Sequence, residues 1–74
     1  MGAALMSLLR IAIRYGSKVI RYLKASISVI KSYGIKFVKW ICNNITKVAD
    51  AIFCADALKD FIEWLKDKAE DLGF

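Results

Sequence analysis

Apolar residues recur every three or four positions along the whole chain, and no segment shows a sustained alternation of apolar and polar residues. This spacing is that of an α-helix with one buried face, whereas a half-buried strand alternates with a period of two. The chain also has no proline, and its four glycines stand apart from one another. The pattern predicts an all-α fold, a compact bundle of four to five short amphipathic helices.

Helix boundaries are indicated by glycine and by side chains that cap helix ends. Gly16 and Gly34 stand where glycine commonly terminates a helix, Asn43-Asn44 is a poor helix former, and Asp56 is a natural N-cap. The helices are expected at about residues 3–15, 18–32, 35–42 and 46–54, with a last one after Asp56.

A set of large apolar side chains on the predicted inner faces forms the expected core. Its members share the helical spacing within each segment, which places them on one side of their helix. The expected core residues are Leu9, Ile13, Ile20, Leu23, Ile27, Ile41, Phe61, Ile62 and Leu65.

The length of 74 residues indicates a single helical domain over residues 1–74. A domain of this size buries only about 60% of its chain surface, so it usually needs a cross-link, a partner or efficient packing.

One continuous helix would hold Cys42 and Cys54 about 18 Å apart, too far to bond. A turn near Asn43-Asn44 would allow a disulfide worth about 3 kcal/mol. We expect that intramolecular bond, and the alternative is two buried thiols.

Charge is divided sharply along the chain, although the net value is only +5. Residues 1–49 hold nine Lys and Arg and no acidic residue, whereas residues 50–74 hold seven acidic residues and three lysines. Such asymmetry suggests an anionic partner for the basic part, either nucleic acid or a lipid surface. The alternative is that the acidic segment neutralises the basic one within a single bundle.

Several kinds of chemistry are disfavoured by the composition. Without histidine, the chain has no Ser-His or Cys-His nucleophile pair and no imidazole metal ligand, and two cysteines alone make a poor zinc site. Isolated glycines form no phosphate-binding loop. We therefore expect no catalytic residue, no metal, no cofactor and no small-molecule substrate. The longest uncharged run, Met1 to Leu9, is far shorter than the ~20 apolar residues of a transmembrane span.

Basic amphipathic helices suit a lipid interface, and tryptophans at the edge of an apolar stripe can anchor there. Tyr15, Tyr22, Tyr33 and Phe37 are interleaved with basic residues, which also suggests stacking on single-stranded nucleic acid, but no known nucleic-acid-binding module is present. The candidate membrane-binding residues are Arg10, Arg14, Lys18, Arg21, Lys24, Lys31, Lys36, Lys39, Trp40, Lys47 and Trp64.

Three segments carry a family resemblance. The opening Met1-Gly2-Ala3 matches the start of the enterocin-type leaderless bacteriocins. The run from Leu8 to Val19, which contains Tyr15-Gly16-Ser17-Lys18, is similar to a Tyr-Gly-Ser-Lys stretch of lacticin- and aureocin-type members. The segment from Ala57 to Lys66 resembles their C-terminal helix, with Trp64 among apolar residues and lysines. The chain is longer than usual members, has two cysteines, and has an acidic last helix.

The resemblance implies a protein that is made without a leader, is secreted, and folds as a saposin-like helical bundle. Such proteins kill related bacteria by permeabilising the cytoplasmic membrane. We therefore expect a membrane-active antimicrobial protein that acts on the anionic lipids of target bacteria. The alternatives are a small self-associating structural or adaptor subunit, for example a phage-encoded one, and, less favoured, a basic nucleic-acid-binding module.

Overall fold

The computed structural model describes residues 2–74, and this part of the chain is helical with no strand. The all-α fold expected from the apolar spacing is therefore confirmed for these residues. Residues 2–74 form six α-helices, one more than the upper expectation. The elements are α1 (Gly2–Ala12), a 3-10 turn η1 (Ile13–Tyr15), α2 (Ser17–Ala25), α3 (Ile27–Ser32), α4 (Ile35–Asn43), α5 (Ile45–Cys54) and α6 (Leu58–Asp71).

The additional helix arises because the segment expected as one helix over 18–32 is interrupted at Ser26. The backbone of Ser26 leaves the helical region at φ −97° and ψ 2°. Its side chain is fully buried, and its hydroxyl has no hydrogen-bond partner in residues 2–74. A buried hydroxyl of this kind normally finds a partner, so its burial at the α2–α3 junction costs free energy.

The other joints follow the sequence more closely. Gly16 and Gly34 precede α2 and α4 with φ of 105° and 92°, a conformation that residues with a side chain rarely adopt. The break expected at Asn43-Asn44 is confirmed, and the side-chain amide of Asn44 donates to the carbonyl of Trp40 at 2.8 Å. Asp56 is not the cap of the last helix, because α6 begins two residues later and its N-cap is Ala57, without a side-chain hydrogen bond.

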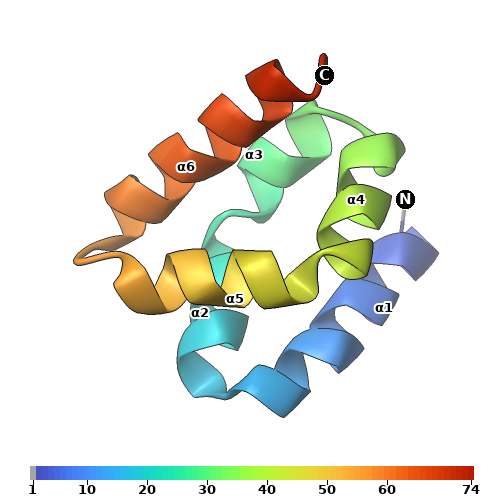
Figure 1. The fold of residues 1–74 in the computed structure, drawn as a ribbon. Coiled ribbons are helices and arrows are strands. Elements are labelled where there is room, and N and C mark those ends of the chain that lie inside the picture. The colour runs from blue at the N-terminus through green and yellow to red at the C-terminus, as the bar shows by residue number, and fades with distance from the viewer. Residues whose placement is uncertain (1) are drawn as a thin grey trace.

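Figure 1 shows how the helices are arranged. The first helix packs against α4, α2 packs against α5, and α3 lies between α4 and α6. Helices α5 and α6 meet at their short connection and diverge from it, so that they form a V in this view. The radius of gyration is 10.9 Å, close to the roughly 11 Å expected of a globular chain of this length.

Two buried phenylalanines organise the core. Phe37 of α4 has ring centroids of Tyr33, Trp40 and Phe74 within 6.0 Å of its own. Phe61 of α6 lies 6.0 Å from both Tyr22 and Trp64. Aromatic pairs at such distances add to the energy of burial. The buried apolar residues are Leu8, Ala12, Val19, Leu23, Ile30, Phe37, Val38, Ile41, Ile45, Val48, Ala49, Ile52, Phe61, Leu65 and Ala69.

The predicted core is right in part. Four of its nine members are buried, namely Leu23, Ile41, Phe61 and Leu65, and four are half-buried, namely Leu9, Ile20, Ile27 and Ile62. Ile13 is wrong, since 63% of it is exposed.

The predicted disulfide is also wrong, because Cys42 and Cys54 are both free. The turn at Asn44 is present, but α5 then runs for ten residues away from it. A helix of that length carries the chain about 15 Å, whereas bonded cysteines have Cα atoms within about 7 Å. Cys42 instead packs against α1, where its Sγ lies 4.0 Å from the carbonyl oxygen of Ala4. Cys54 is exposed at the far end of α5.

Replacement of Ser26 by alanine is expected to stabilise the protein. The variant removes a buried hydroxyl without a partner, whose desolvation costs about 1–3 kcal/mol. Ser28→Ala is the matched control, because Ser28 lies on the next helix and is exposed. Urea denaturation should show Ser26→Ala more stable than Ser28→Ala by about 1 kcal/mol. A loss of stability in Ser26→Ala would mean that the hydroxyl holds the junction together.

Candidate functional site

The outer face of α1 and η1 carries an apolar stripe that residues 2–74 leave largely exposed. Met6 and Ile13 are 57% and 63% exposed, and Leu9 between them is half-buried without packing against the core. At 100° per residue, the three side chains fall within an arc of about 60°. We call Met6, Leu9 and Ile13 the α1 stripe.

The stripe exists because α1 is apolar on more than one side. Leu8 and Ala12 are buried, and Leu5 packs against the core beside them, so these residues form the inner face. The sequence prediction assigned Leu9 and Ile13 to that face. Since apolar residues surround most of this helix, their spacing alone does not define which side is buried.

Arg10 and Arg14 flank the stripe, and both are exposed. Both stand roughly 40–80° around the helix from Met6. Since the first acidic residue of the chain is Asp50, no carboxylate on the same helix neutralises them. Apolar side chains beside arginines give this helix the composition of one that lies in a membrane interface.

Seven other basic residues were predicted to bind membranes, and six of them are exposed: Arg21, Lys24, Lys31, Lys36, Lys39 and Lys47. Lys18 differs, because it is half-buried and its ammonium donates to the carbonyl of Ala55 at 3.4 Å. The same ammonium lies 5.3 Å from the ring centroid of Tyr22. Lys18 therefore ties α2 to the C-terminal end of α5, where a cation interacts favourably with the helix dipole.

Most of the acidic residues lie on the other side of the molecule from α1. Five of the seven acidic residues belong to α6, which occupies the side opposite α1 in Figure 1. The division of charge along the sequence thus becomes a division in space, with α1 and α2 basic and α6 acidic.

Both tryptophans are half-buried and hold fixed positions. Trp40 stacks on Phe37 with an angle of 10° between the ring planes, and Trp64 stacks on Phe61 with an angle of 15°. Each indole is partly exposed. A role of Trp40 and Trp64 as membrane anchors stays a prediction.

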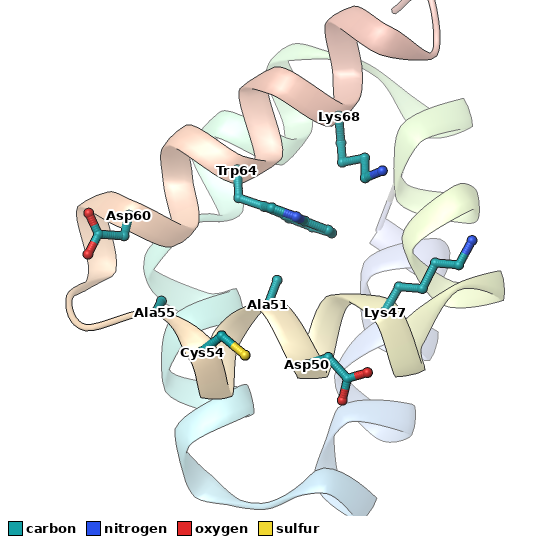
Figure 2. Close-up of a pocket in the computed structure, with 8 residues that line it drawn as sticks. All are labelled: Lys47, Asp50, Ala51, Cys54, Ala55, Asp60, Trp64 and Lys68. Carbon is teal, nitrogen blue, oxygen red and sulfur yellow. The ribbon is translucent and has the colours of Figure 1, made fainter.

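A groove of about 570 Å³ separates α5 from α6. Figure 2 shows Trp64 projecting from α6 across this groove toward α5, and the amines of Lys68 and Lys47 at the end nearest α4. The carboxylates of Asp50 and Asp60 point away from the groove in the same view. The groove was not predicted from the sequence, because α5 and α6 were not placed relative to each other.

The aromatic residues proposed for nucleic-acid stacking do not form an exposed platform. Phe37 is fully buried, and Tyr15, Tyr22 and Tyr33 pack against the core. Single-stranded nucleic acid needs ring faces that are open to the bases. This observation counts against the nucleic-acid alternative.

Two further features of the described residues bear on function. No group of three or more Cys, Asp or Glu residues in the part from 2 to 74 has the arrangement of a metal site. Over the same part, each helix is too short or too polar to traverse a bilayer.

Comparisons of the chain with protein-family models, with curated proteins and with solved structures find no match. The saposin-like arrangement implied by the bacteriocin resemblance therefore stays a prediction. One part of that resemblance, Met1, lies outside the described residues.

The two thiols are expected to react with iodoacetamide without prior reduction, Cys54 first. Cys54 is exposed, whereas burial raises the pKa of the Cys42 thiol and lowers its thiolate fraction near neutral pH. Mass spectrometry of the native protein should show one adduct early and two later. In denaturant the two sites should react at similar rates. If neither thiol reacts until a reductant is added, the two cysteines form a disulfide after all.

Proposed function

We propose that the chain is a secreted, membrane-active antimicrobial protein that docks on anionic bacterial membranes and permeabilises them. The observation that carries this proposal is the exposed apolar α1 stripe, with Arg10 and Arg14 beside it. Ile13, one of the residues expected in the core, is the most exposed large apolar residue among residues 2–74. The resemblance to leaderless bacteriocins supports the same function.

Docking begins with electrostatic attraction. Each Lys or Arg near an anionic surface contributes about 1 kcal/mol, and residues 2–49 hold exposed cations but no acidic residue. The attraction is screened over about 10 Å at 0.1 M salt, so binding weakens as the salt concentration rises. Arg10 and Arg14 beside the exposed α1 stripe orient the protein with α1 toward the membrane.

Insertion follows from the apolar side chains that the fold leaves in water. Transfer of the α1 stripe into the interface removes Met6 and Ile13 from solvent, and full burial of such a side chain is worth about 1.5–3 kcal/mol. In the membrane, the apolar face of α1 that packs against α4 in water can contact acyl chains instead. Separation of the helices in the interface exposes further apolar faces to the acyl chains and disturbs the bilayer.

A second function is favoured by the same stripe, because an exposed apolar face also suits contact between copies of one chain. In a self-associating subunit, Ile13 would lie against another protomer rather than lipid. Sedimentation of the protein in water separates these functions, since the membrane-active protein is monomeric before it meets lipid and the subunit is oligomeric.

Arg10→Gln/Arg14→Gln is expected to weaken binding to vesicles rich in phosphatidylglycerol by up to about 2 kcal/mol, or roughly 30-fold. Both side chains are exposed, so the fold should be unchanged. Lys59→Gln/Lys66→Gln removes the same charge from exposed positions on α6 and is the matched control.

Binding is measured by cosedimentation and permeabilisation by release of a trapped dye, each against vesicles of anionic and of neutral lipid. The control pair should resemble the parent protein in both assays. Equal dye release from the two kinds of vesicle, or equal effects of the two variants, would contradict the docking step and favour the self-associating subunit.

A further inference from the structure

The groove between α5 and α6 has a geometry that follows directly from helical spacing. Asp60, Trp64 and Lys68 stand four residues apart on α6, and Lys47 and Ala51 stand four apart on α5, with Ala55 directly after its end. Residues at this spacing share one face of a helix. Because the two helices diverge from a short connection, residues near the end of α6 and the start of α5 lie at the wide, open end of the groove. Lys68 and Lys47 both line the groove, and their amines extend toward its open end, nearest α4 (Figure 2).

The inner part of the groove is apolar and has a fixed wall. Trp64 is held by its stacking on Phe61 at 6.0 Å, and the opposite wall consists of the small side chains of Ala51 and Ala55. The alanines leave the indole face accessible from α5. A volume of about 570 Å³ is within the usual range of small-molecule sites, about 300–1,000 Å³.

The open end of the groove is cationic. The ammonium of Lys68 lies 5.9 Å from the ring centroid of Trp64, and the amine of Lys47 extends toward the same end. Although the lining also includes Asp50 and Asp60, their carboxylates point out of the groove. An anion at this end would meet two ammonium groups without a facing carboxylate.

We propose that this groove binds one anionic phospholipid, with the phosphate between Lys47 and Lys68 and the first part of an acyl chain along Trp64. The proposal rests on the proposed membrane function and names a lipid contact separate from the α1 stripe. A free phosphate ion would use only the two lysines, whereas a phospholipid uses both the cationic end and the adjoining apolar wall. That match of charge and apolar surface favours the lipid. It also assigns a lipid-binding role to an otherwise acidic helix.

The test uses the full-length, ¹⁵N-labelled protein and dihexanoylphosphatidylglycerol, a short-chain anionic lipid, below the concentration at which it forms micelles. The indole N–H signals of Trp64 and Trp40 are followed by NMR and assigned with Trp40→Phe. Saturable movement of the Trp64 signal, with the Trp40 signal stationary, is the expected result. Equal movement of both signals, or of neither, would overturn the proposal.

Two further ligands separate the parts of the interaction. Inorganic phosphate tests charge alone, and hexyl glucoside tests the six-carbon chain alone. Neither ligand, at the concentrations used for the lipid, should shift the Trp64 indole N–H signal in a way that saturates. If inorganic phosphate reproduces the lipid titration, the groove is a site for a free anion and the proposal is wrong. If hexyl glucoside reproduces it, the lysines have no role and the proposal is equally wrong.

Lys47→Gln/Lys68→Gln should weaken lipid binding at Trp64 at least tenfold. Lys59→Gln/Lys66→Gln changes the net charge equally, on positions of α6 outside the groove, and should weaken it less than twofold. Similar losses in both variants would mean that net charge, not the groove, determines binding. Vesicle binding that depends on Arg10 and Arg14 but not on the groove would overturn this inference and leave the proposed function intact.

Discussion

The structure depends on the burial of two phenylalanines by helices that are too short to be stable alone. The α-helices have between 6 and 14 residues, and isolated helices below about 12–15 residues are marginal in water. Phe37 fixes α4 against the C-terminal Phe74, and Phe61 fixes α6 against Tyr22 of α2. These contacts join segments that are distant in sequence. The stability of each helix therefore comes from its neighbours, and a change of environment that replaces those neighbours affects all of them.

The fold class could be predicted from the sequence because the apolar spacing is helical throughout. The joints at Gly16, Gly34 and Asn44 could also be placed, since each has a local chemical reason to leave the helix. The break at Ser26 could not, because serine is tolerated within helices and only its burial in the tertiary structure sets it apart. For the cysteines, the turn between them was foreseen, but the direction of α5 after that turn depends on packing.

The candidate site was predictable in its composition and not in its geometry. The basic residues and tryptophans were recognised from charge and stripe position, and most of these cations are exposed. The position of Ile13 on α1 and η1 was assigned wrongly, because apolar residues surround most of this helix and only the contact with α4 distinguishes buried Leu8 from half-buried Leu9. The exposure of this apolar face has a consequence in water and in lipid. An apolar face that the fold leaves uncovered beside arginines is costly in water, and a lipid interface offsets that cost.

The central claim is that the α1 stripe enters the lipid, and the depth of single side chains tests it most directly. A spin label is placed at position 13, and in a second protein at position 66 on α6, after both native cysteines are replaced. Electron paramagnetic resonance in anionic vesicles then compares the collisions of each label with oxygen, which concentrates in lipid, and with a water-soluble nickel complex. The account predicts that the label at 13 lies below the phosphates while the label at 66 remains in water. A label at 13 that stays in water on fully bound protein would contradict it.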